Sequence, residues 1–162
     1  MPAPDGARDT RPVETDEKTI LRRRTRAREL ALQFLYQWDQ RGEEVVQNLI
    51  AFVIDGDRDA SVQRFARDLV AGVIDNAAEI DKVIAGVAEN WDLHRMAVVD
   101  RNVLRLATYE LLYLPDIPPK VSINEAIDLA KKFSTAESGA FVNGILDKIR
   151  KKCTADKGET GQ

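Results

Sequence analysis

The chain has 162 residues, of which 24 are Lys or Arg and 27 are Asp or Glu, and its formal net charge is -3. A single domain is expected, because domains typically span about 100 to 150 residues. Nine glycines, six prolines and one cysteine exclude collagen-like and disulfide-framework proteins. No apolar run approaches the roughly 20 residues of a transmembrane helix. The slightly acidic total excludes coating of nucleic acid by bulk charge, so any nucleic-acid binding must be local.

Both ends of the chain differ in composition from its middle. Residues 1–19 hold three of the six prolines, and residues 152–162 are mostly small and polar. We expect a disordered extension over 1–19 and a disordered tail over 152–162, flanking one helical domain over 20–151. No secretory signal pattern is visible, which favours a cytoplasmic location. Cys153 lies alone in the polar tail and is expected to be an incidental reduced thiol.

Between the ends, apolar residues recur with helical spacing, and no segment alternates long enough to predict a strand. The segment 98–114 is apolar on nearly every side, which is typical of a helix enclosed by others. The predicted helices cover, in chain order, about 22–42, 44–54, 62–73, 80–88, 98–114, 122–133 and 138–149. The pattern therefore predicts an all-α fold, a single compact seven-helix domain whose two helical lobes meet near residues 75–78.

The start of the sixth helix carries a recognisable signal. Residues 114–119 contain three prolines and are expected to be non-helical. Ser122 and Glu125 then have the spacing of a capping box, in which the serine caps the first turn and the glutamate bonds back to it. We therefore predict Ser122 as the N-cap residue.

Residues suited to catalysis are scarce. His94 is the single histidine, so neither a Ser-His-Asp nor a Cys-His arrangement can be assembled, and a metal site is not expected. The two common glycine-rich phosphate loops are absent from the sequence. His94 is expected to be solvated or to serve in a helix cap. We predict a protein that is not an enzyme and needs no cofactor.

The most informative feature is the segment RRRTRARE over residues 22–29, in which five arginines and one glutamate give +4. Placed at the N-terminal end of the first predicted helix, these cations oppose the helix dipole by about 0.3 to 1 kcal/mol each. An anionic partner explains them better, and a short segment that orders on binding favours RNA over duplex DNA. The alternative is a solvated charge run that precedes a helix.

Two aromatic residues are candidates for the same surface. Tyr36 lies about opposite the apolar stripe of the first predicted helix and is expected to be exposed, as interface aromatics are. Phe141 lies off the apolar stripe of the last helix and could stack on an unpaired base. The alternative is that neighbouring helices cover both rings.

Three long blocks of the sequence resemble the NusB family of bacterial transcription antitermination factors. They are RRRTRARELALQFLYQ, VVDRNVLRLATYELLYL and DIPPKVSINEAIDLAKKFSTAESGAFVNGILDKI, and they extend from about residue 22 to residue 150. The resemblance implies a seven-helix protein that pairs with NusE, a small-subunit ribosomal protein, to bind the boxA RNA element. It also implies a place in the RNA polymerase antitermination complex, notably in ribosomal RNA operons.

The resemblance also implies roles for individual residues. The arginine-rich RNA-binding motif of the family falls on Arg22, Arg23, Arg24, Arg26 and Arg28. Phe141 matches an aromatic position near the RNA, and Glu137 matches an acidic position that tunes RNA affinity by repulsion. Tyr36 and Asp100 match positions on the surface that faces NusE. Thr25 interrupts the arginine run, which is expected to matter little.

Two other functions remain open at this point. NusB-like domains also occur as accessory domains of RNA methyltransferases, although about 130 helical residues leave no room for the parallel sheet that would hold S-adenosylmethionine. A helical adaptor that binds only protein would keep the surface at Tyr36 and Asp100 and show no RNA affinity. An exposed apolar surface could also close a homodimer over the RNA site. No membrane contact is expected.

Overall fold

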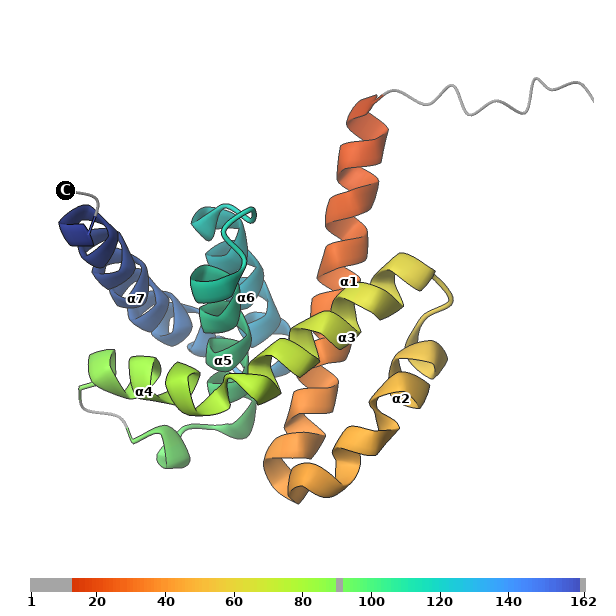
Figure 1. The fold of residues 1–162 in the computed structure, drawn as a ribbon, viewed down its shortest axis with the longest axis horizontal. Helices are drawn as coiled ribbons and strands as arrows, with labels where there is room; N and C mark the ends of the chain where they lie inside the picture. Colours follow the sequence, from red (N-terminus) through yellow and green to blue (C-terminus); the bar gives the residue numbers. More distant parts are fainter. Residues whose placement is uncertain (1–12, 90–91, 161–162) are drawn as a thin grey trace, which may run out of the picture.

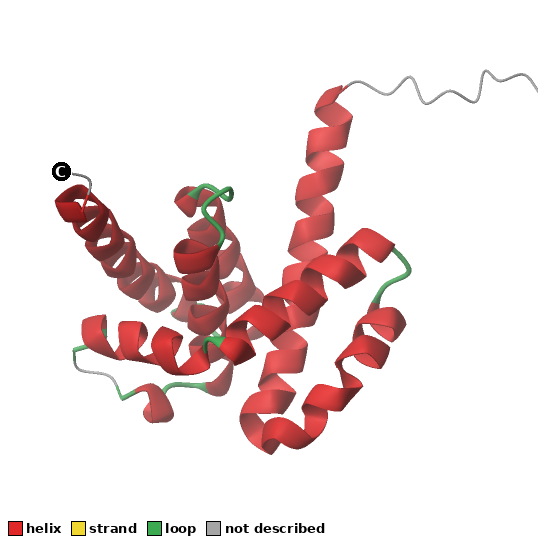
Figure 2. Cartoon of the chain, viewed as in Figure 1, coloured by secondary structure: helices red, strands yellow, loops and turns green. Residues whose placement is uncertain are grey.

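The computed structural model describes residues 13–89 and 92–160, and every regular element in these ranges is a helix (Figures 1 and 2). The elements are α1 (Val13–Arg41), the 3-10 helix η2 (Gly42–Asn48), α2 (Leu49–Gly56), α3 (Ala60–Asp75), α4 (Ala77–Val87), the 3-10 helix η3 (Leu93–Arg95), α5 (Val98–Tyr113), α6 (Pro119–Phe133) and α7 (Ser138–Thr160). The predicted all-α fold with seven α-helices is confirmed. None of the described helices is long and apolar enough to span a membrane.

α5 is the central helix of the fold. It packs against α1, α3, α4, α6 and α7, and most of its residues between Asp100 and Glu110 are buried. In Figure 1, α1, α2 and α3 lie on one side of the molecule, whereas α4, α6 and α7 lie on the other side with α5. The buried apolar side chains of the two groups form one core, so these lobes share a single hydrophobic interior.

The two lobes meet where α3 passes directly into α4. Only Asn76 separates the two helices, and its side-chain amide donates to the carbonyl oxygen of Gly72 at 2.8 Å. Gly72 lies against the ring of Tyr109 in α5, because a Cβ atom at this position would come within 2.1 Å of the ring carbon Cζ. A side chain at position 72 would therefore collide with the ring of Tyr109, and either this ring or α3 would have to shift.

Both end helices extend beyond their predicted bounds. α1 begins at Val13 and α7 continues to Thr160, so residues 13–19 and 152–160 are helical; residues 1–12 and 161–162 of the expected tails lie outside the described residues. These additions have no apolar periodicity, but a packed helix can propagate through such residues at little cost once it is nucleated. The arginine segment consequently lies in the middle of α1, and the expected conflict with the helix dipole is wrong, because that effect is confined to the terminal turns.

The predicted start of the sixth helix is also wrong. α6 begins three residues earlier, with Pro119 in its first turn, where the missing N–H of proline costs nothing. Ser122 is buried inside the helix, and its hydroxyl donates to Glu110 Oε1 at 2.8 Å. Ser122 and Glu125 therefore contact other helices and do not form a capping box.

A cluster of buried charges joins α1, α4 and α5. The carboxylate of Asp39 in α1 accepts hydrogen bonds from Arg101 at 2.6 Å and Arg105 at 2.6 Å, and from the amide of Asn102 at 3.0 Å. Arg105 also pairs with Asp81 of α4 at 2.8 Å. Burial disfavours the ionised carboxylate, but the hydrogen bonds from Arg101 and Asn102 and the two positive charges lower the pKa of Asp39 to about 2.

We expect Asp39→Asn to lower the free energy of unfolding at pH 7 by about 2 kcal/mol, because both arginines lose their shared anion. The folded-state pKa of about 2 lies below the ordinary value of 3.8. The stabilisation is therefore complete above that ordinary value and is lost as the pH falls through the folded-state pKa. Urea unfolding between pH 7 and pH 2 should show the two proteins converging at the acid end. Asp116→Asn, at an exposed loop position, is the control and should match the parent.

Candidate nucleic-acid interface

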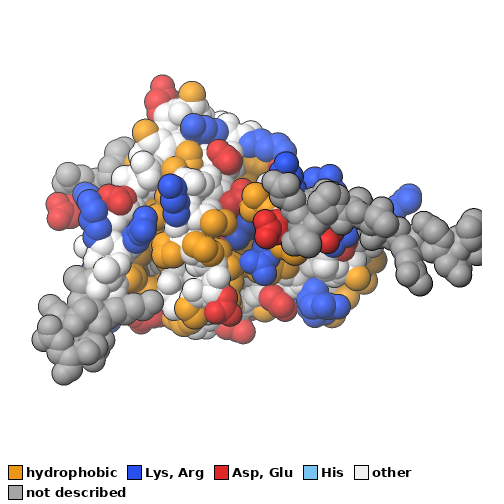
Figure 3. Space-filling model, turned by 90° about the horizontal axis from the view of Figure 1, so that it is seen from above, with side chains coloured by type: hydrophobic (Ala, Val, Ile, Leu, Met, Phe, Trp, Pro, Cys, Tyr) orange, Lys and Arg blue, Asp and Glu red, His pale blue; other side chains and the backbone are white. Residues whose placement is uncertain are grey.

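The five arginines of the α1 segment have different surroundings. Arg22 and Arg24 are exposed and have no carboxylate partner among the described residues, whereas Arg23 is half-exposed and pairs with Asp59 at 2.8 Å. Arg26 is partly buried, and Arg28 is fully buried. Seen from the end to which α1 projects, Lys and Arg side chains gather around this helix, with acidic side chains among them (Figure 3).

Arg28 is a structural residue of the core. It is 1% exposed, and two of its nitrogens reach the two carboxylate oxygens of Glu110 at 2.8 Å each. A third nitrogen donates to Glu125 at 2.9 Å. Burial disfavours the charged guanidinium, but the hydrogen bonds and charges of Glu110 and Glu125 raise the pKa of Arg28 above its ordinary value. The guanidinium thus stays charged, and each of its three nitrogens donates to a carboxylate.

In this arrangement Arg28 presents no surface to RNA, so its predicted RNA contact would require α1, α5 and α6 to move apart. The helical pattern places Arg28 at the border of the apolar stripe, and the sequence does not show that α5 and α6 bring two carboxylates to that border. Thr25 takes part in the same cluster, since its hydroxyl bonds to Glu125 and to the carbonyl oxygen of Leu21. The interruption of the arginine run thus has a structural use.

Arg26 is held by the loop between α2 and α3. One terminal nitrogen donates to the carbonyl oxygen of Gly56 at 2.9 Å, and Nε lies 3.5 Å from Asp57. Glu29 is 3.6 Å from Arg26 and also pairs with Lys132 of α6. This arginine is therefore largely neutralised inside the protein, although part of it faces solvent.

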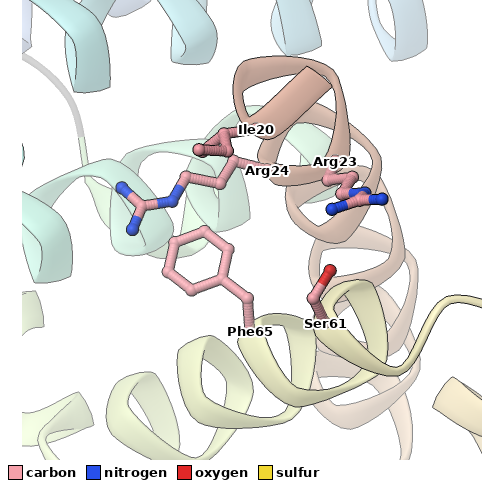
Figure 4. A pocket seen from close by; sticks show the side chains of 5 residues that line it. All are labelled: Ile20, Arg23, Arg24, Ser61 and Phe65. Carbon is pink, nitrogen blue, oxygen red and sulfur yellow. The ribbon is translucent and has the colours of Figure 1, made fainter. Parts of the chain in front are cut away.

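Arg24 lies over an aromatic ring that belongs to α3. Its guanidinium carbon is 5.0 Å from the ring centroid of Phe65, and that of Arg28 is 5.6 Å from the same centroid. Figure 4 shows Arg24 and Arg23 extending from α1 on two sides of a small cavity, with Phe65 and Ser61 of α3 opposite them. Phe65 was not predicted as a site residue, because its spacing on α3 indicates only a core position.

The structure brings three predicted site residues together in a second cavity. Phe141, Glu137 and Asp100 line a space of about 280 Å³, together with Arg95. Asp100 is only 9% exposed, its Oδ2 accepts from Ser138 at 3.2 Å, and its buried Oδ1 has no hydrogen-bond partner among the described residues. Asp100 meets solvent at this cavity, and its contact with a protein partner stays a prediction.

Tyr36 projects from the surface of α1, as predicted from the helical pattern. It is 45% exposed and lines a separate cavity with Leu32, Val99 and Phe133. Twelve residues separate Tyr36 from Arg24 along α1, which corresponds to about 18 Å of helix. The exposure of Tyr36 is confirmed, and its contact with a partner stays a prediction.

Two lysines at the end of α6 were missed by the sequence analysis. Lys132 pairs with Glu29 of α1 yet keeps an exposed side chain, and the exposed Lys131 passes close over Gly139 at the start of α7. They therefore lie between the arginine segment and the cavity that contains Phe141. Helical spacing identifies both as surface residues. Only the packing of α6 against α1 and α7 shows that they lie next to the arginine segment and to the start of α7.

His94 has the role expected for it. It is exposed in η3, and its backbone N–H donates to the side chain of Asp92, which caps this short helix, at 3.0 Å.

Comparison with known families matches the NusB family over residues 25–151. The chain belongs to the NusB family. The match spans Arg26, Arg28, Tyr36, Asp100, Glu137 and Phe141, and it begins after Arg24. The resemblance stated from the sequence blocks is confirmed.

Named relatives extend over most of the chain. The transcription antitermination protein NusB of Desulfatibacillum aliphaticivorans is 49% identical over 78% of this chain and 89% of its own length. That of Anaeromyxobacter sp. is 52% identical over 78% of this chain and 89% of its own length. Among solved structures, NusB of T. maritima has a TM-score of 0.71 and 44% identity, covering 79% of this chain and 90% of its own. A crystal structure of the antitermination factors NusB and NusE in complex with dsRNA has a TM-score of 0.73 and 32% identity, covering 81% and 98%.

We expect Arg28→Ala to lower the free energy of unfolding by about 3 to 5 kcal/mol, because Glu110 would remain buried without its cation. Urea unfolding followed by circular dichroism measures the change. Arg24→Ala is the matched control and should cost about 1 kcal/mol or less, since it removes only an exposed contact with an aromatic ring. A variant Arg28→Ala that unfolds like the parent but no longer binds RNA would restore Arg28 as an RNA contact.

Proposed function

We propose that this NusB-family protein binds boxA-type RNA of ribosomal RNA operons together with NusE and so supports transcription antitermination by RNA polymerase. The observation that carries the proposal is the unpaired positive charge of Arg22 and Arg24 on α1, in a protein whose net charge is negative. Family membership supports the same function, and a related structure contains NusB with NusE and dsRNA.

The arginines contribute unequally to this binding. Arg22, Arg23 and Arg24 have guanidinium groups that reach solvent and can displace counterions from phosphates. Arg26 contributes less, since Asp57 and Glu29 already balance its charge. Arg28 contributes indirectly, because its buried ion pairs fix the face of α1 that carries the others.

A second RNA contact is proposed at the cavity that contains Phe141. An aromatic ring that lines an accessible cavity can stack on an unpaired base, whereas Glu137 at the same cavity repels phosphate. Lys131 and Lys132 line the path from the arginine segment to this cavity. A single strand could follow this path, with phosphates near the cations and a base at Phe141.

The partner surface is proposed at Tyr36. Its ring and the neighbouring Leu32, Val99 and Phe133 form an accessible apolar recess, which suits a protein partner. NusE is the partner that the family resemblance implies. The protein then acts by binding, without bond-making chemistry: permanent cations hold RNA, and base contacts made jointly with the partner give selectivity.

We expect the double variant Arg22→Ala, Arg24→Ala to weaken binding of boxA RNA and to flatten its salt dependence. Each lost phosphate contact should reduce the slope of log affinity against log salt by about 0.7 for a single strand. Fluorescence anisotropy with labelled RNA in the presence of NusE, over a salt series, measures both effects. Arg41→Ala is the matched control, because Arg41 is an exposed arginine at the far end of α1. An unchanged affinity in the double variant would reject the proposed function.

We expect Tyr36→Ala to lower affinity for NusE by about 10-fold or more, as loss of an interface aromatic typically does. Isothermal titration without RNA measures this contact by itself. Tyr113→Ala is the control, since Tyr113 is also exposed but lies on α5 and stacks on Tyr109. An unchanged NusE affinity in Tyr36→Ala would place NusE elsewhere.

A further inference from the structure

A small cavity between α1 and α3 adjoins the arginine segment (Figure 4). Its lining consists of Ile20, Arg23 and Arg24 from α1 and Ser61 and Phe65 from α3, around about 230 Å³. One water molecule occupies about 30 Å³ of liquid volume, so this space is larger than a bound water or a simple anion requires. Nothing in the family resemblance assigns Ile20, Ser61 or Phe65 a role.

One side of the cavity is lined by the apolar side chain of Ile20, the aromatic ring of Phe65 and the planar guanidinium of Arg24. Ile20 is 51% exposed even though it lies beside the partly buried ring of Phe65. The Arg24 guanidinium lies over that ring, and guanidinium planes stack well on bases. A flat, partly apolar group placed here would cover Ile20 and extend the stack of Phe65 and Arg24.

The opposite wall presents a cation whose orientation is fixed. Nε of Arg23 pairs with Asp59 at 2.8 Å, and Asp59 in turn accepts from both the backbone N–H (2.8 Å) and the hydroxyl (2.6 Å) of Ser61. These contacts hold the Nε edge of Arg23 toward α3. The two terminal amino groups of Arg23 have no hydrogen-bond acceptor among the described residues and remain available to an anion.

We infer that this cavity takes one nucleotide of single-stranded RNA, with its base against Ile20 and the stacked Arg24 and Phe65, and its phosphate on Arg23. The inference rests on the proposed RNA binding and adds a base contact from α3. A phosphate ion alone would leave the apolar wall uncovered, and an apolar peptide would leave Arg24 and the terminal amino groups of Arg23 without an anion. Bases inside a duplex are already stacked and cannot enter such a cavity without flipping out.

Two neighbouring residues of almost equal exposure provide the test. Ile20 is 51% exposed and Leu21 is 49% exposed, but only Ile20 lines the cavity. We expect Ile20→Ala to weaken binding of single-stranded boxA RNA by about 3- to 10-fold, and Leu21→Ala to stay within about 2-fold of the parent. Fluorescence anisotropy on the full chain with NusE measures both, and circular dichroism verifies that both variants fold.

A set of RNAs that each lack one base tests what enters the cavity. At one position, removal of the base should weaken binding to the parent protein and eliminate the difference between the parent and Ile20→Ala. If Ile20→Ala remains weaker than the parent by the same factor with every abasic RNA, the occupant is not a base and the inference is wrong. Equal binding of Ile20→Ala, Leu21→Ala and the parent would also overturn it.

Two further binding measurements distinguish a nucleotide in the cavity from a protein segment or a paired RNA. Ile20→Ala should leave NusE binding without RNA and binding of a fully paired RNA unchanged. A loss of NusE affinity would show a protein occupant, and an equal loss on paired RNA would show that no unpaired base is needed; either result overturns the inference. If the parent protein binds no RNA at all, the proposed function itself fails, which is a distinct outcome.

Discussion

The buried contact of Arg28 with Glu110 and Glu125 is the interaction on which the arrangement of the surface depends. It joins α1, α5 and α6 through charges that lie almost entirely out of water. Removing these charges from water is costly. That cost is offset because each of the three guanidinium nitrogens of Arg28 donates to a carboxylate oxygen of Glu110 or Glu125. The hydroxyl of Ser122 adds a further donor to Glu110. The rotation of α1 about its own axis is thereby fixed, and with it the direction in which Arg22, Arg23 and Arg24 project.

One run of arginines thus performs two physical tasks. The C-terminal members, Arg26 and Arg28, are balanced by carboxylates from other parts of the fold, whereas Arg22 and Arg24 are left free among the described residues. Phe65 contacts both groups, since Arg24 and Arg28 each lie over its ring. The buried Arg28 and the solvent-facing Arg24 of the proposed RNA surface therefore pack on the same aromatic side chain of α3.

Net charge gives little information about such a surface. Arg101 and Arg105 pair with Asp39 and Asp81, so their charges are already balanced within the protein even though they count in the total. Lys131 and Lys132, which have no special sequence pattern, lie on the surface between the arginines and Phe141. What matters for a polyanion is which cations lack a partner and where they point, and both are properties of the tertiary structure.

The sequence by itself determined the helical fold, the central position of α5 and the exposure of Tyr36, because each follows from apolar spacing along a single helix. The family blocks also identified the arginine segment. The tertiary structure alone decided that Arg28 is buried, that Ser122 and Glu125 bind other helices, and that Asp100, Glu137 and Phe141 share a cavity. The physical reason is that these outcomes depend on which charges meet across helices far apart in the chain, and periodicity within one helix carries no information about its neighbours.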